Sequence, residues 1–212
     1  MRLPRAYREG GLLTWHHLLT LVWLNLIWLV LAWTVVLAGP ATLAVYALIA
    51  TTMRQDRDPD LRRFLPLLRQ NVVPGVLWLL TTALVAFVLY SNVVYWQRVL
   101  GPFGKTVLTL VAAYLAWLYV ALQPYLLEAL SVERLPYLRA WRAALLNLGR
   151  HPVSAHLYVL VPVVLVLLSL LTRTFVMIVL VSVALTFAAV QVRPFEPLPE
   201  PLDDPADPAA PA

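Results

Sequence analysis

The chain alternates between long apolar stretches and shorter segments that are rich in arginine. The apolar stretches cover about residues 18–52, 74–96, 105–127 and 152–192. A helix needs about 20 apolar residues to cross the roughly 30 Å of hydrocarbon in a bilayer. The second and third stretches have the length of one crossing each, whereas the first and the last have the length of two. The pattern therefore predicts an all-α, polytopic membrane bundle of about six transmembrane helices.

The first stretch contains Gly39-Pro40, which divides it into two predicted helices. Proline suits the first turn of a helix, where its missing N–H needs no partner. We predict one helix over about 15–38 and a second over about 40–53, with a turn or break at Gly39-Pro40. The second helix would be only about 20 Å long. It either ends below the membrane interface or is a re-entrant half-helix packed against protein.

The basic residues gather on one side of this predicted bundle. With six crossings, 13 of the 16 basic residues fall on the side of the N-terminus, and Arg98, Lys105 and Arg173 fall on the other. Cytoplasmic loops collect Lys and Arg. The pattern thus predicts that both termini lie in the cytoplasm.

Composition agrees with a membrane protein. Hydrophobic residues make up 61% of the 212 residues and charged residues 13%, and the mean hydropathy is +0.78. Ordinary soluble domains are nearer half apolar and a quarter charged. The formal charge of +5 would be +10 without residues 194–212, which hold five acids and no base. A basic membrane body without a nucleic-acid motif predicts contact with anionic lipid head groups and not with nucleic acid.

The segment 194–212 differs in character from the rest of the chain. It is rich in proline and acids and poor in apolar side chains. Such a segment cannot bury enough apolar surface to fold. We therefore predict a membrane domain over residues 1–193 and a disordered cytoplasmic tail over 194–212.

Two of the basic loops, residues 59–70 and 134–150, have apolar residues at helical spacing. These are Leu61, Phe64, Leu65 and Leu68 in the first loop, and Leu138, Trp141, Leu145 and Leu148 in the second. The arginines beside them are Arg62, Arg63, Arg69, Arg139, Arg142 and Arg150. The pattern is typical of helices that lie in the membrane interface. Either these helices cap the bundle and touch lipid head groups, or they dock to a partner subunit.

Four polar residues in or beside the predicted spans are candidates for function: Asn25, Gln123, Glu128 and His156. Asn25 is expected to form an interhelical hydrogen bond, and a ligand or ion contact is the alternative. Glu128 ends the fourth predicted helix, where it either pairs with Arg134 or Arg139 or acts as a functional ionisable group. His156 is expected to be a structural residue, an interface anchor or a partner of Glu128. The four residues would line a path if the protein were a small transporter or channel.

Catalytic and metal-binding patterns are not evident in the sequence. There is no cysteine, and the adjacent rings of His16 and His17 would point about 100° apart on a helix. That is poor geometry for a shared metal ion. The sequence has no Gly-rich phosphate loop, and its serines have no evident base and orienting partner. We therefore expect no enzyme activity, no cofactor and no metal.

The stretch "NLIWLVLAWTVVLAGPATLAVYALI" resembles the opening signature of the YesL-like family, a bacterial membrane family of unknown function. The matching residues are Asn25, Trp28, Gly39, Pro40, Ala41 and Thr42. The looser segments "LRRFLPLLRQNVVPGVLW" and "LRAWRAALLNLGRHP" extend the resemblance over about residues 12–192. This chain differs from the family pattern in its Pro- and acid-rich tail and in having Arg in place of much of the Lys.

The resemblance implies a bacterial inner-membrane protein with an accessory role beside carbohydrate-uptake ABC transporters. Our leading hypothesis is a non-enzymatic accessory or assembly protein that docks to ABC transporter subunits through residues 59–70 and 134–150. The alternative is a small autonomous transporter or channel.

Overall fold

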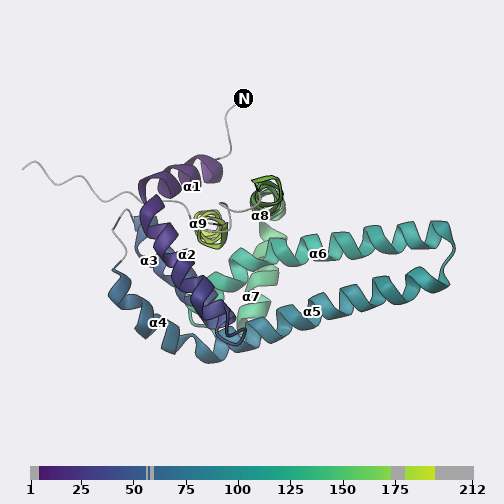
Figure 1. Ribbon diagram of the computed structural model, residues 1–212, viewed down its shortest axis with the longest axis horizontal. Coiled ribbons are helices and arrows are strands. Elements are labelled where there is room, and N and C mark those ends of the chain that lie inside the picture. The colour runs from purple at the N-terminus through teal and green to yellow at the C-terminus, as the bar shows by residue number, and fades with distance from the viewer. Residues whose placement is uncertain (1–4, 56, 58–59, 173–179, 194–212) are drawn as a thin grey trace, which may run out of the picture.

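The computed structural model describes residues 5–55, 57, 60–172 and 180–193, and within these ranges the protein is helical without strands (Figure 1). The helices are α1 (Arg5–His16), α2 (Leu18–Ala32), α3 (Ala38–Thr51), α4 (Phe64–Gln70), α5 (Val72–Val99), α6 (Pro102–Ser131), α7 (Tyr137–Arg150), α8 (Pro152–Thr172) and α9 (Leu180–Val192). Two short 3₁₀ turns, η1 (Met53–Gln55) and η2 (Leu61–Arg63), lie between α3 and α4. The predicted all-α class is confirmed. The predicted tail and Arg173 lie outside the described residues.

Three of the described helices are long and apolar enough to cross a membrane, namely α5, α6 and α8. A fourth span is added if α1 and α2, which meet at an angle of 85°, are counted as one bent span. In Figure 1, α5 and α6 run across the picture, whereas α8 and α9 are seen nearly end-on. The long helices therefore do not share one direction. The chain is a polytopic membrane protein by length and composition, and the count of six crossings stays a prediction.

The first predicted helix, over 15–38, is wrong in its bounds. The helix is interrupted at His17, whose backbone angles are φ −108° and ψ 24°, and α2 already ends at Ala32. The chain turns over residues 33–37 and not at Gly39-Pro40. Pro40 lies in the first turn of α3, because proline needs no N–H partner there. That part of the prediction, a second helix that begins near Pro40, is confirmed.

The turn between α2 and α3 pairs its own backbone groups. Every N–H from Trp33 to Ala38 donates to a backbone oxygen of residues 29–35 or to the hydroxyl of Thr34. Val35 adopts a φ of 61°, which is costly for a β-branched residue. The turn has no charged side chain, and Trp33 is 91% exposed. Hydrocarbon demands such internal pairing, so the features favour a re-entrant hairpin whose turn stays within the bilayer.

Helix α3 is the centre of the bundle. All its residues from Gly39 to Ala50 are buried, and it contacts α2, α4, α5, α6 and α9. Its closest neighbour is α5, because a Cβ atom on Gly39 would lie 2.1 Å from the carbonyl oxygen of Gly75. A Cβ atom on Gly75 would lie 2.4 Å from the nitrogen of Pro40. Glycine at both positions is therefore required for the two backbones to cross at this distance.

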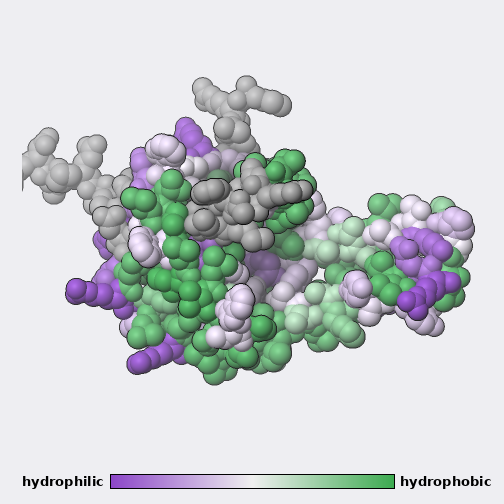
Figure 2. Space-filling view, viewed as in Figure 1, coloured by the Kyte–Doolittle hydropathy of each residue, from purple (hydrophilic) through white to green (hydrophobic). Residues whose placement is uncertain are grey.

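Helices α5 and α6 form a long antiparallel hairpin that extends away from the other helices (Figure 1). The indole Nε1–H of Trp78 donates to Oε1 of Gln123 at 2.8 Å and joins the two helices near the body. Figure 2 shows mostly apolar surface along the hairpin, with hydrophilic surface at its far end and at the opposite edge of the molecule. Apolar surface between two polar ends is the pattern of an element that crosses a membrane.

The two predicted amphipathic helices are present as η2–α4 and α7. In η2–α4, Phe64 and Leu68 are buried, whereas Leu61 and Leu65 are exposed. The structure therefore divides the predicted apolar face, of which only part contacts the bundle. Leu61 and Leu65 lie on the outside of the protein, whereas Leu67 packs partly against the core.

Helix α7 packs along α6, and its buried residues only partly match the predicted apolar face, from which Trp141 and Leu148 pack against the core. Ala140 and Ala144 are completely buried, because small side chains let two helices approach closely. Leu138 and Leu145 from the predicted face are 82% and 55% exposed. The outer side of α7 is therefore both apolar and basic.

The glycine contact between α3 and α5 can be tested with matched alanine substitutions. We expect Gly75→Ala to lower the free energy of unfolding by about 1–3 kcal/mol or more, because overpacking forces two backbones apart. Gly11→Ala is the control, since a Cβ on this helical glycine meets nothing within 4 Å. It should leave stability unchanged or raise it by up to about 1 kcal/mol. Thermal unfolding in mild detergent measures both, and equal effects would contradict the close crossing.

The membrane arrangement can be tested by labelling single cysteines, because the wild-type chain has none. We expect Lys105→Cys, near the far end of the α5–α6 hairpin, and Arg62→Cys to react with a membrane-impermeant maleimide from opposite sides. We expect Val36→Cys in the re-entrant turn to react from neither side until detergent is added. Labelling of Val36→Cys from the same side as Lys105→Cys would show that α2 and α3 cross completely.

Candidate functional site

Three helix ends meet in a buried cluster of charged groups. Tyr46 on α3 and Arg54 on η1 approach Glu128 on the last turns of α6, and Arg193 approaches it from the end of α9. Glu133, just beyond α6, completes the group. These five residues are called the Glu128 cluster below. The five residues come from three segments that are far apart in sequence, namely α3–η1, the end of α6 and the end of α9.

The carboxylate of Glu128 is only 2% exposed, accepts hydrogen bonds from Tyr46 and Arg54, and forms an ion pair with Arg193. The Tyr46 hydroxyl donates to Oε2 at 2.9 Å. Arg54 approaches both carboxylate oxygens at 3.4 and 3.5 Å, and Nε of Arg193 lies 3.0 Å from Oε1. A carboxylate buried away from water needs such donors, because an isolated charge is very costly in a medium of low dielectric.

The cluster balances two positive charges with two negative ones. Arg54 is buried and also donates to the backbone carbonyl of Ala189 on α9 at 3.4 Å. Arg193 is about half exposed and donates from its terminal nitrogen to Glu133 at 2.9 Å. The arrangement is a neutral ion-pair network that connects the ends of α3, α6 and α9. Because both of its carboxylate oxygens are paired with protein groups, Glu128 serves as a connection between helices.

The prediction that Glu128 pairs with Arg134 or Arg139 is wrong. Arg134 adopts a left-handed backbone conformation, with φ at 54°, after the end of α6. Its guanidinium donates to Gln70 at the end of α4, 2.7 Å away. Arg139 lies on the exposed side of α7. The chain reverses at Arg134, and this reversal carries the nearby arginines away from Glu128.

The sequence places Arg54 and Arg193, the observed partners of Glu128, on the same side of the membrane as Glu128, although residue spacing does not pair them. Arg54 and Arg193 each follow a predicted helix that ends on the same side of the membrane as the end of the fourth one. Counting crossings therefore placed three helix ends, two cations and one carboxylate at one face. The rotation of each helix, which decides whether they meet, depends on packing.

The other polar candidates do not meet Glu128. Asn25 is completely buried, and its Oδ1 accepts from the backbone N–H of Ser182 on α9 at 3.3 Å. This is the predicted interhelical hydrogen bond. Gln123 accepts from Trp78 and donates to the carbonyl of Tyr119 within α6. Nδ1 of His156 lies 2.7 Å from the carbonyl oxygen of Pro152 in its own helix.

The residues of the opening signature form contacts around α3. The indole Nε1–H of Trp28 donates to the Thr42 hydroxyl at 2.8 Å and joins α2 to α3. Thr42 in turn donates to the carbonyl of Ala38 at 2.8 Å. Ala41 is completely buried, and Gly39-Pro40 forms the crossing with α5. The signature thus positions α3 against its neighbours, and Asn25 adds the connection to α9.

Comparison with known families agrees with this grouping. Residues 21–93 match the model of a family described as "Protein of unknown function, DUF624". The matched segment is about a third of the chain and contains Asn25, Trp28, Thr42 and the Gly39–Gly75 crossing. No curated protein and no solved structure matches the chain. The family description names no function, and the apolar helices support a membrane protein.

The basic positions singled out in the two amphipathic segments are all on the outside of the molecule. The exposed arginines are Arg62, Arg63, Arg69, Arg139, Arg142 and Arg150. Among the described residues, no group of three or more His, Cys, Asp or Glu side chains has an arrangement that could hold a metal ion. The cluster around Glu128 is also unsuited to a metal, because two guanidinium groups compete for its carboxylate.

Removal of the Glu128 charge should destabilise the fold strongly. We expect Glu128→Gln to lower the free energy of unfolding by about 3–5 kcal/mol, because Arg54 is left buried without a counter-ion. Glu133→Gln is the control, since its partner is half exposed, and its effect should be under about 1 kcal/mol. Unfolding in mild detergent measures both free energies.

A double variant shows whether the loss comes from the uncompensated charge. Arg54→Met combined with Glu128→Met should recover much of the stability, because apolar residues of similar volume can replace a buried ion pair. If Glu128→Gln costs no more than Glu133→Gln, the cluster does not hold the three helix ends together.

Proposed function

We propose that this protein is a non-enzymatic accessory or assembly partner of a carbohydrate-uptake ABC transport system in the bacterial inner membrane. The resemblance of its opening signature to the YesL-like family supports the link to such systems. The asymmetric distribution of arginine supports an orientation with both termini in the cytoplasm. In this proposal the docking surface consists of the outer sides of η2–α4 and α7.

The observation that carries the proposal is the outward side of α7. Ala140 and Ala144 are buried, and Trp141 and Leu148 pack partly against the core, whereas Leu138 and Leu145 stay exposed beside Arg139 and Arg142. A helix that only covered its own bundle would turn most of its leucines inward. Exposed leucine and arginine together fit a surface that binds a second protein, because apolar anchors supply contact area and charges supply specificity.

The arrangement of the polar candidates supports docking over autonomous transport. Asn25 joins α2 to α9, Gln123 joins α6 to α5, and His156 bonds within α8. Gln123 and Glu128 are five residues apart on α6, so their side chains point about 140° apart around the helix. A transport path needs its polar groups on one continuous surface, and these four do not share one.

One observation supports the alternative of autonomous transport: the ionisable residue Glu128 lies at the end of a membrane-length helix. Liposomes that contain only this protein provide its test. Substrate-dependent flux that Glu128→Ala abolishes, with folding checked in parallel, would establish transport and overturn the accessory proposal.

The docking surface is tested by purification from the native host in mild detergent. We expect membrane subunits of a carbohydrate-uptake ABC transporter to co-purify stoichiometrically with the wild-type protein. Substitution of Arg62, Arg63, Arg139 and Arg142 by Gln should reduce their recovery on the order of tenfold, because several surface charge contacts are lost together. Quantitative mass spectrometry of the bound proteins measures the change.

A matched control changes basic residues at the far end of the hairpin. Arg98→Gln combined with Lys105→Gln should leave recovery of the transporter subunits unchanged. The docking proposal fails if the fourfold variant retains its partners as well as the wild type does. It also fails if the wild-type protein is purified without a transporter subunit.

A further inference from the structure

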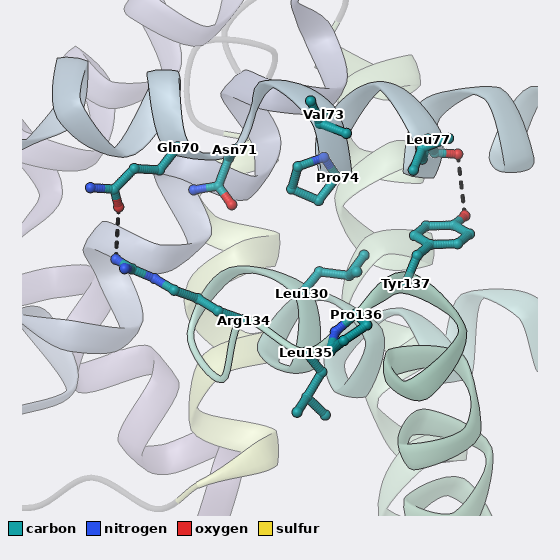
Figure 3. A pocket seen from close by; sticks show the side chains of 10 residues that line it. All are labelled: Gln70, Asn71, Val73, Pro74, Leu77, Leu130, Arg134, Leu135, Pro136 and Tyr137. Carbon is teal, nitrogen blue, oxygen red and sulfur yellow. Dashed lines mark hydrogen bonds between the residues drawn. The ribbon is translucent and has the colours of Figure 1, made fainter.

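A cavity of about 510 Å³ lies between the start of α5 and the loop that joins α6 to α7 (Figure 3). Its lining comes from the α4–α5 junction on one side and from residues 130–137 on the other. Two hydrogen bonds hold the sides together. Arg134 donates to Gln70 at 2.7 Å, and the Tyr137 hydroxyl donates to the carbonyl of Leu77 at 3.2 Å. The cavity is therefore braced at both ends.

One end of the cavity is polar and positively charged. Arg134 and Gln70 lie at this end, and Asn71 lies beside them (Figure 3). The Nδ2 group of Asn71 donates to the carbonyl of Leu67. In Figure 3 the side-chain oxygen of Asn71 points toward the side of the cavity on which Arg134 lies. A guanidinium has five N–H donors in a planar fork. The hydrogen bond to Gln70 orients the fork and engages one of its nitrogens.

The other end of the cavity is apolar. Val73, Leu77 and Leu130 line it, together with Pro74 and Pro136. Val73 is 68% exposed and Leu77 is 40% exposed, although both belong to a helix long and apolar enough to cross a membrane. Acyl chains are the natural contact for such side chains. The cavity thus changes from charged to apolar along its length.

The cavity lies at the ends of two helices that are long and apolar enough to cross a membrane. Val73 is in the first turn of one membrane-length helix, α5, and Arg134 follows the last turn of another, α6. The ends of spanning helices lie at the membrane–water interface, where head groups and Arg side chains meet. Arginine matches phosphate oxygens with parallel N–H donors.

We propose that this cavity binds one anionic phospholipid, with Arg134 on the phosphate and one acyl chain along Val73 and Leu77. Gln70 is a positioning residue that holds the guanidinium in place. The site uses none of the six arginines of the docking surface. The lipid proposal can therefore be tested independently of the proposed partner.

The test is native mass spectrometry of the purified full-length protein, titrated with phosphatidylglycerol or phosphatidylcholine. We expect the wild type to retain one phosphatidylglycerol and to bind phosphatidylcholine more weakly. Arg134→Asn should weaken phosphatidylglycerol binding roughly tenfold, because a charged hydrogen-bond donor is removed. Asparagine tolerates the left-handed backbone at this position, so the end of α6 is preserved.

Two further variants separate the cavity from the general basic surface. Gln70→Ala should weaken phosphatidylglycerol binding severalfold without a change at the end of α6. Arg8→Gln, an exposed basic residue on α1 outside the cavity and the docking surface, should leave binding unchanged. Equal binding by the wild type and by both cavity variants would overturn the proposal, and so would an equal loss in Arg8→Gln.

A soluble competitor distinguishes a lipid site from a general phosphate site. Millimolar glycerol 3-phosphate carries the same phosphate ester without an acyl chain. We expect it to leave the bound phosphatidylglycerol in place, since the apolar wall contributes to binding. Complete displacement of the lipid by glycerol 3-phosphate would show a soluble phosphate site and overturn the lipid assignment.

Discussion

The close crossing of α3 and α5 at Gly39 and Gly75 is the contact on which the arrangement of the other helices depends. With both backbones at this distance, α3 lies deep enough to be enclosed by five other helices. The short length of α3 allows this enclosure, because a half-length helix can be buried on all sides within the bundle. The neighbouring turn pairs its own N–H groups, which is the condition for placing irregular backbone in hydrocarbon.

Polar groups inside the bundle specify which helices meet. Trp28 with Thr42, Asn25 with Ser182 and Trp78 with Gln123 each connect a different pair of helices. Each such bond is worth little in a membrane, commonly about 1 kcal/mol. Their larger effect is on specificity, because an alternative packing would leave the same groups unpaired in an apolar medium. The Glu128 cluster applies the same constraint to the ends of α3, α6 and α9 at higher energetic cost.

One end of the molecule thus combines three features. The Glu128 cluster fixes the helix ends, α4 and α7 present arginine and leucine outward, and the Arg134 cavity lies between them and the start of α5. A bound lipid at this cavity would contact both sides of the gap between α4 and the α6–α7 loop. It would therefore stabilise the position of α4 and α7, the two helices of the proposed docking surface.

The local sequence pattern determined much of the secondary structure of this protein. Apolar length alone predicted helices over about 74–96 and 105–127 and two more within 152–192, and helical spacing predicted both amphipathic segments. Proline chemistry placed Pro40 in a first turn, and burial of an amide predicted the interhelical bond of Asn25. These inferences hold because hydrophobic periodicity, backbone hydrogen bonding and the cost of an unpaired polar group act within one segment.

Other features were decided only by the tertiary structure. The interruption at His17, the turn at 33–37 and the choice of Arg54 and Arg193 as partners of Glu128 have no local pattern. The same is true of Ala140 and Ala144 on α7, which are buried while only Trp141 and Leu148 of the predicted apolar face pack against the core. Each of these depends on how far a helix rotates about its axis and on where the chain turns after it ends. Packing against distant segments sets both quantities.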